Sequence, residues 1–213
     1  MTMPETGTPL YRLCRFLLRI LFRLFNRWEV AGRDHVPEAG GVLLIANHTS
    51  YADPPIVGTA CPRPVHFLAK AELFHLPLLS GLIRRTYAFP VRRDGADRAA
   101  LREAIRLLRE GKVLLIFPEG TRSYDGRLKD LELGAAFIAL SAQAQVVPLA
   151  IIGADRLLPR GKPVLLPAKL RVRFGPALDC SRFRGQPLSR QLCEQATDQM
   201  AAALRQLLPP ERR

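Results

Sequence analysis

The sequence predicts an α/β fold in which a mixed, largely parallel sheet is covered by helices on both faces. Two observations along the chain predict it: short apolar runs alternate with segments of helical periodicity, and the apolar runs are nearly continuous. Continuous apolar strands are typical of a sheet buried on both sides. The 213 residues are 48% hydrophobic and 7% aromatic, which suits one globular domain with a substantial core.

The first expected element is a basic amphipathic helix over residues 10–28. Its arginines recur in steps of three or four and fall on one helical stripe: Arg12, Arg15, Arg19, Arg23 and Arg27. Leu, Ile and Phe fill the rest of its surface. Because five guanidinium groups are costly inside a bilayer and spoil a signal-peptide core, we expect a helix lying in the membrane interface. The alternative is a helix docked on the protein's own core with its arginines in solvent.

Strands are expected next, at residues 41–46, 64–69, 86–91, 112–117, 145–152 and 169–174. Between the third and fourth, residues 96–110 carry apolar side chains at helical spacing, and Gly111 stands where a left-handed cap is expected. The longest uncharged stretch, residues 133–154, contains Gln143 and Pro148. It therefore favours a helix followed by a buried strand over a membrane span.

The charge balance points to anionic partners. Lys and Arg number 32 against 19 Asp and Glu, a net charge of +13. Such an excess attracts anionic lipid, nucleic acid or phosphorylated small molecules. The four cysteines show no paired spacing and no Cys/His metal pattern, which favours reduced thiols and gives no reason to expect a metal site.

Polar clusters follow three of the expected strands, at residues 47–53, 92–98 and 118–127. In a largely parallel sheet the carboxyl ends of the strands meet at one edge, where active-site loops gather. The third cluster, "FPEGTRS", offers Gly120 for close backbone approach and Arg122 as a planar fork for phosphate oxygens. An ordinary Pro-Glu-Gly turn with an incidental arginine is the alternative. For Arg98, which opens a helix in the second cluster, we adopt the solvated reading, in which the arginine belongs to a solvent-exposed basic edge.

The first cluster lies in "IANHTSYADP", which holds His48 and Asp53 five residues apart. Asp53 suits a helix start, with Pro54 as the first helical residue, or a capping box with Ser50. Neither explains His48. A turn entering a helix would let the carboxylate orient the imidazole as an acid–base group. Ser50 is the alternative nucleophile of a hydrolase, but it lacks the G-x-S-x-G elbow.

These blocks resemble a known family. "NHTSYAD" fits the N-H-x4-D block of the PlsC-type glycerolipid acyltransferases, the lysophosphatidate acyltransferase family, and "FPEGTRS" and "VVPLAI" fit two later blocks. Between them, "HFLAKAELF" and "FPVRR" are similar to its lysine–glutamate segment and arginine block. One block alone is a modest signal, whereas four in the family's order over residues 29–175 are a strong one.

The resemblance implies direct acyl transfer without a covalent enzyme intermediate. His48 is then the general base for a glycerol hydroxyl, and Asp53 holds it. The substrate-binding positions that the resemblance implies are Arg93 (with Arg92 as the alternative), Glu119, Gly120, Thr121 and Arg122, and Pro148 is a weaker match to an acyl-donor position. One departure is that Leu133-Gly134 stands where the family usually has a lysine–glycine step.

We therefore divide the chain into a membrane-interface helix, residues 1–28, and an acyltransferase domain, residues 29–213. The expected partners are an anionic membrane surface, a lysophospholipid, and acyl-CoA or acyl carrier protein as co-substrate. No metal, other cofactor or nucleic acid is expected. Lysophosphatidate is the expected acceptor, with lyso-ornithine lipid or another lysolipid left open. The protein itself is expected at the cytoplasmic face of the cell membrane, as a peripheral or monotopic protein. A non-catalytic adaptor that binds anionic membranes is the alternative from another class.

Overall fold

The protein is described by a computed structural model, which covers residues 7–92, 97–161, 164–180, 183 and 185–213. Within these residues the strands form one sheet in the order β1-β7-β6-β2-β5-β3-β4. The strands are β1 Glu29–Ala31, β2 Val42–Ala46, β3 Val65–Lys70, β4 Ala88–Val91, β5 Val113–Ile116, β6 Gln145–Ile152 and β7 Arg171–Phe174.

The sheet is mixed and largely parallel, as predicted. β2 pairs in parallel with β5 and β6, and β3 pairs in parallel with β5 and β4. The strand direction reverses only at the edge formed by β7 and β1. There β7 is antiparallel to β6, and β1 pairs in parallel with β7. The six expected strands are confirmed with ends shifted by up to two residues. The sequence reading missed β1, which is only three residues long and depends on pairing with a strand 142 positions away, from Glu29 to Arg171.

The helices are α1 Pro9–Phe25, η1 Arg33–His35, α2 Asp53–Ala60, η2 Ala71–His75, α3 Pro77–Arg85, α4 Arg98–Arg109, α5 Gly134–Ala142, α6 Ala154–Leu157, α7 Arg190–Leu207 and η4 Pro210–Arg212. The predicted helix at 96–110 is α4. Its start is set by Asp97, whose Oδ1 accepts hydrogen bonds from the N–H groups of Ala99 and Ala100 at 3.0 Å each. It is followed by Gly111 at φ +79°, the left-handed residue expected there.

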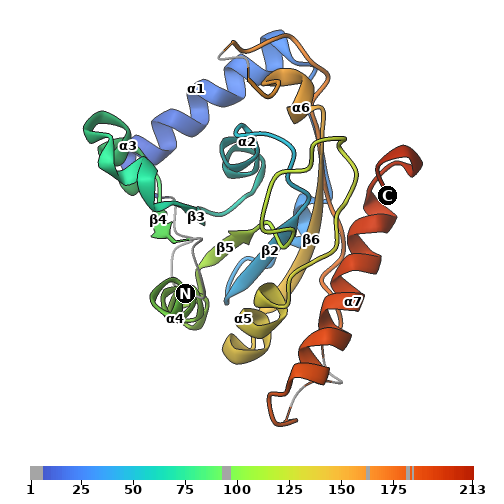
Figure 1. Cartoon of the computed structure of the whole chain (residues 1–213). Coiled ribbons are helices and arrows are strands. Elements are labelled where there is room, and N and C mark those ends of the chain that lie inside the picture. Colours follow the sequence, from blue (N-terminus) through green and yellow to red (C-terminus); the bar gives the residue numbers. More distant parts are fainter. Residues whose placement is uncertain (1–6, 93–96, 162–163, 181–182, 184) are drawn as a thin grey trace.

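Helices cover both faces of the sheet (Figure 1), and the side chains of β2 alternate between the two faces. In β2, Val42 and Leu44 enter the apolar cluster beneath α1, α2 and α6, whereas Leu43 and Ile45 enter the cluster beneath α4, α5 and α7. This alternation follows from the two-residue period of a strand. Burial on both sides explains why β2 reads as an uninterrupted apolar run.

Helix α1 docks on α2 in an orientation that the sequence reading did not anticipate. Arg15 donates to the carbonyl oxygens of Cys61 and Pro62, and Arg19 donates to that of Thr59. These carbonyls lie at the C-terminal end of α2, where the helix dipole favours a cation. Part of the arginine stripe therefore faces the protein, not lipid phosphate or solvent as expected.

The apolar side of α1 faces outward instead. Six of its large side chains are between 41% and 72% exposed: Leu13, Phe16, Leu17, Ile20, Leu24 and Phe25. Tyr11 and Phe22 are the buried side chains of the helix. Across the described part of the chain, no helix combines the length and apolar character needed to cross a bilayer.

Candidate active site

The turn between β2 and α2 holds the predicted acid–base pair. Asp53 is completely buried, and its Oδ2 accepts a hydrogen bond from Nδ1 of His48 at 2.8 Å. The same oxygen accepts the N–H groups of Thr49 at 2.7 Å and Ser50 at 2.8 Å. A fully buried carboxylate requires such donors. Asp53 therefore shapes the turn and orients the imidazole with one oxygen atom.

The imidazole of His48 is held on a second side by an aromatic ring. It stacks on Phe117 with 4.0 Å between ring centroids and 15° between planes. Because Nδ1 donates to Asp53, Nε2 is the nitrogen that can accept a proton from a substrate. His48 lines a cavity of about 370 Å³ at the carboxyl ends of β2, β3, β4 and β5.

Glu119 connects this turn to the "FPEGTRS" turn. It is 5% exposed, and its Oε1 accepts the N–H of His48 at 2.7 Å while Oε2 accepts the N–H of Lys129 at 3.0 Å. A third bond, from the N–H of Ser123 to the carbonyl of His48 at 2.7 Å, joins the same two turns. Burial raises the pKa of Glu119. Both carboxylate oxygens thus bind backbone, a positioning contact that sequence reasoning did not find.

Gly120 adopts a left-handed backbone conformation that favours glycine. Its φ is +68°, and an added Cβ would lie 2.1 Å from Oε1 of Glu132. Gly120 and Thr121 line the cavity beside His48. The backbone freedom expected of Gly120 is therefore used, although in this structure it makes room for a carboxylate of the same chain.

Cations surround the turn. The guanidinium of Arg122 stacks on the ring of Tyr51, with its Cζ 3.6 Å from the ring centroid. The ammonium of Lys129 donates to Oγ1 of Thr121 at 3.2 Å and to the carbonyl of Arg122 at 3.1 Å. Lys129 was not singled out from the sequence. It brings a cation to this turn although Leu133 replaces the family's usual lysine.

The second polar cluster is described only in part. Arg92 and Asp97 line the cavity with His48, whereas Arg93 lies outside the described residues. Arg98 is exposed at the start of α4, which agrees with the solvated reading.

Two other expectations concern Ser50 and Pro148. The Ser50 side chain is 1% exposed, and its Oγ donates to the carbonyl of Leu158 at 3.0 Å and accepts the N–H of Ala52 at 3.2 Å. The hydroxyl is thus part of the turn, which argues against a nucleophilic role. Pro148 is buried in β6 in register with Ile45, and its link to the acyl donor stays a prediction.

The remaining histidines are His35, His66 and His75. Nδ1 of His35 lies 2.9 Å from the carbonyl oxygen of Phe174, and Nδ1 of His66 lies 3.3 Å from that of Val113. His75 is exposed in η2. The contacts of His35 and His66 with backbone carbonyls fit structural roles.

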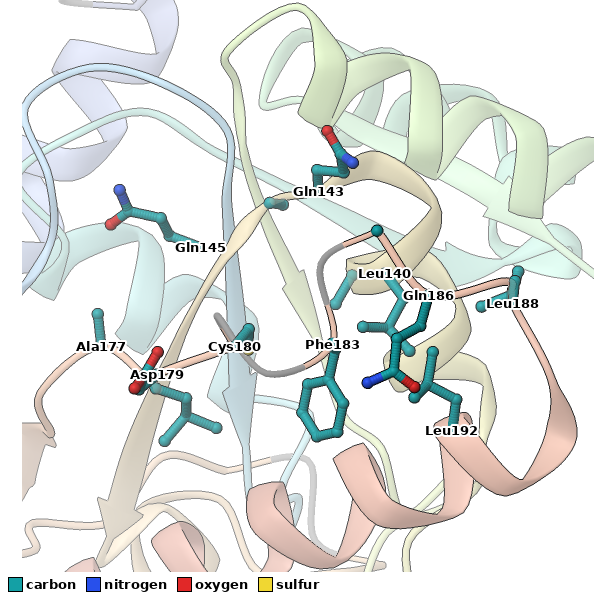
Figure 2. A pocket seen from close by; sticks show the side chains of 14 residues that line it. Leu140, Gln143, Gln145, Ala177, Asp179, Cys180, Phe183, Gln186, Leu188 and Leu192 are labelled. Carbon is teal, nitrogen blue, oxygen red and sulfur yellow. The ribbon is translucent and has the colours of Figure 1, made fainter.

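A second cavity, of about 310 Å³, opens where α5 ends and β6 begins (Figure 2). Side-chain amides and apolar groups line most of it, among them Gln143, Gln145, Gln186, Leu140, Phe183 and Leu192. Asp179 and Cys180 are the ionisable residues among its described lining.

The fold and the first cavity are those of an α/β protein with a candidate acid–base site. A histidine oriented by a buried carboxylate stands beside a cation-bearing turn at the carboxyl edge of a largely parallel sheet. Such a site can activate a hydroxyl on a substrate that carries an anionic group.

The chain belongs to the Acyltransferase family, whose model matches residues 27–152. It is 28% identical over 184 residues to a 1-acyl-sn-glycerol-3-phosphate acyltransferase of Bacillus subtilis, covering 86% of this chain and 89% of that protein. A protein of the same name from Chlamydomonas reinhardtii is 31% identical, with 88% of this chain and 54% of that protein covered.

The fold is shared as well. The crystal structure of the 1-acyl-sn-glycerophosphate acyltransferase PlsC from Thermotoga maritima superposes with a TM-score of 0.73 at 25% identity, covering 92% of this chain and 79% of that one. The family resemblance predicted from the sequence is confirmed. The protein is therefore an acyltransferase, and the non-catalytic adaptor reading is set aside.

Proposed function

We propose that this acyltransferase moves a fatty acyl group from an acyl thioester, acyl-CoA or acyl carrier protein, to the free hydroxyl of 1-acyl-glycerol-3-phosphate, giving phosphatidic acid. The observation that carries the proposal is the 2.8 Å contact between His48 and Asp53, which stands beside the turn that bears Arg122. The names of the relatives support the choice of acceptor.

His48 acts as general base in this reaction. Its Nε2 takes the proton of the acceptor hydroxyl while the hydroxyl oxygen attacks the thioester carbonyl carbon. The tetrahedral intermediate then collapses, the carbon–sulfur bond breaks, and the imidazolium returns the proton to the leaving thiolate. Asp53 stabilises the imidazolium through Nδ1, and no bond forms between the acyl group and the enzyme.

The acceptor phosphate is assigned to the cationic side of the site. Arg122, whose guanidinium carbon lies over the ring of Tyr51, offers a fork for phosphate oxygens. Arg93 remains assigned to the same phosphate, with Arg92 as the alternative. Glu119 contributes by holding His48, because a carboxylate bound by two backbone N–H groups is poorly suited to contact a phosphate.

The membrane contact is assigned to α1. Its exposed apolar side chains, led by Leu24 at 72% and Phe25 at 61%, would enter the acyl region of an anionic leaflet. The exposed arginines Arg12, Arg23 and Arg27 would meet lipid phosphates at the rim. We place the protein at the cytoplasmic face of the membrane, as a peripheral or monotopic protein.

The test is an acyl-transfer assay with the purified full chain. Labelled acyl-CoA and acyl carrier protein are each offered with a panel of lysolipids, and the products are resolved by mass. Phosphatidic acid should form with the wild type and with His75→Ala, an exposed-histidine control, but not with His48→Ala. Full transfer by His48→Ala, or a preference for an acceptor without phosphate, would contradict the proposal.

A further inference from the structure

We infer that Val164, Leu165 and Leu166 form a second membrane anchor, which inserts into an anionic phospholipid bilayer beside α1 and holds the mouth of the active site at the interface. The inference rests on the proposed function, since a membrane anchor serves an enzyme whose acceptor is a lipid. It assigns the bilayer contact to two segments that are far apart in sequence.

These three residues are consecutive and exposed. Val164 is 57% exposed, Leu165 53% and Leu166 39%. Single exposed apolar side chains are common on soluble proteins, but contiguous ones mark a contact surface. They lie in the connection between α6 and β7.

Hydrogen bonds attach this segment to the end of α1. Asn26, the C-cap of α1, is 3% exposed, and its Nδ2 donates to the carbonyl of Leu166 at 3.5 Å. Its own carbonyl accepts the N–H of Leu170 at 2.9 Å. Leu24 and Phe25, the most exposed apolar residues of α1, directly precede Asn26. The segment after α6 accordingly lies beside the C-terminal end of α1 (Figure 1).

The beginning of the same segment contacts the active site. The carbonyl of Leu158 accepts the hydroxyl of Ser50, in the turn that holds His48. Arg160 lies with its Cζ 3.8 Å from the ring centroid of Tyr124 and donates to the Tyr124 hydroxyl at 3.0 Å. Anchoring Leu165 would therefore fix the depth of the site relative to the bilayer, where the hydroxyl of a lysolipid lies.

Charge at the rim identifies the occupant as an anionic bilayer. Arg160 is exposed on the side of the anchor toward the site, and Arg23 and Arg27 are exposed at the end of α1. Apolar residues flanked by arginines suit a surface whose headgroups carry phosphate. A protein partner would be expected to place carboxylates there instead.

The first experiment compares Leu165→Asp with Leu188→Asp in the full chain. Leu188 is 45% exposed and lines the cavity at the opposite edge of the sheet, which makes it a matched control (Figure 2). Partition onto vesicles of phosphatidylglycerol and phosphatidylcholine should fall about tenfold for Leu165→Asp, since insertion of one leucine is lost, while α1 retains the rest. The control should bind as the wild type does.

The second experiment locates residue 165 directly. Trp28 is the single tryptophan, so Trp28→Phe with Leu165→Trp gives one reporter, and Trp28→Phe with Leu188→Trp gives its control. Lipids brominated in the acyl chain should quench the fluorescence of residue 165 and not that of residue 188. Unquenched emission at 165, or equal partition of Leu165→Asp and the wild type, would overturn the anchor.

Acyl transfer separates this inference from the proposed function. Leu165→Asp should lower transfer to a vesicle-embedded acceptor by about tenfold, in line with its weaker partition, and keep transfer to a monomeric short-chain lysophosphatidate. Loss on both substrates would mean a role in folding or in the site, and would also overturn the anchor. Absence of transfer by the wild type would contradict the proposed function while leaving the quenching result intact.

Discussion

The two cavities lie at opposite edges of one sheet and differ little in size, about 370 Å³ beside His48 and about 310 Å³ beside Gln145. Their linings differ in chemistry. The first contains a histidine whose ring is bound by a fully buried carboxylate, whereas amides and apolar groups predominate in the second. A hollow of ligand size therefore does not identify a site. A site is better identified by buried polar atoms whose hydrogen bonds orient a reactive nitrogen.

The direction of the strands explains the difference. Parallel strands bring the turns after β2, β4 and β5 to one edge, and α2, α4 and α5 begin there. Helix starts present N–H groups and the positive end of the helix dipole, which favour anions. The other cavity lies at the opposite end of α5, where carbonyl groups predominate. An anionic substrate is therefore favoured at the His48 edge.

The largest effect that would test this contrast is expected for His48→Ala. Removing the proposed general base should lower kcat for acyl transfer by about 10³-fold. The melting temperature, measured by circular dichroism, should stay within a few degrees of the wild type. A large fall would show that the variant had lost its fold. Residual transfer close to wild type would mean that the first cavity has no more catalytic role than the second.

Asp53→Asn should come next, with a loss of about 10²-fold in kcat. An asparagine has a single carbonyl oxygen in place of the carboxylate, and it carries no charge to stabilise the imidazolium. Three hydrogen bonds to Oδ2 weaken at once, so the free energy of unfolding should also fall by about 1–3 kcal/mol. Urea titration beside the kinetic assay measures both. Unchanged activity in a stable variant would remove Asp53 from the mechanism.

Arg122→Ala should act on binding. The apparent KM for a phosphorylated acceptor should rise about tenfold, with a smaller change in kcat, because a charge-assisted contact to phosphate is lost. An acceptor without phosphate serves as the control substrate, and its KM should not change. An equal rise for both acceptors would instead indicate that the stack on Tyr51 only shapes the turn.

Glu119→Gln tests the buried carboxylate through pH. Burial raises the pKa of Glu119, so its carboxyl group stays protonated in the folded protein at a pH where it has lost the proton in the unfolded chain. This group therefore makes the free energy of unfolding fall as pH rises from the ordinary glutamate pKa through the raised one. Glu119→Gln should flatten that fall, as measured by urea unfolding across this pH range. If the free energy of unfolding of Glu119→Gln depended on pH as that of the wild type does, the raised pKa of Glu119 would be contradicted.

Gln145→Ala should have the smallest effect. Gln145 is exposed at the start of β6 and lines the second cavity. Transfer should change less than about twofold, as for most exposed substitutions. A large loss of activity in this variant would show that the second cavity also takes part in the reaction, and the contrast between the two edges would no longer hold.

The sequence by itself predicted the class of fold and the contact between His48 and Asp53. Continuous apolar runs predicted the central strands because strands buried on both faces need apolar residues at every position, as in β2. The contact between His48 and Asp53 was predictable because it spans five residues of one turn. The same local reasoning placed the "FPEGTRS" turn at the shared edge, since the direction of a parallel strand decides where its loop emerges.

Only the tertiary structure decided which residues far apart in the sequence contact one another. An arginine stripe predicts an amphipathic helix, but not that Arg15 would bind the carbonyl end of α2 and leave the apolar face outward. Likewise, nothing local to Glu119 indicates that its two oxygens join His48 to Lys129 across 71 and 10 residues. Periodicity records which side chains share a face. It does not record which partner completes their hydrogen bonds, because that partner comes from elsewhere in the chain.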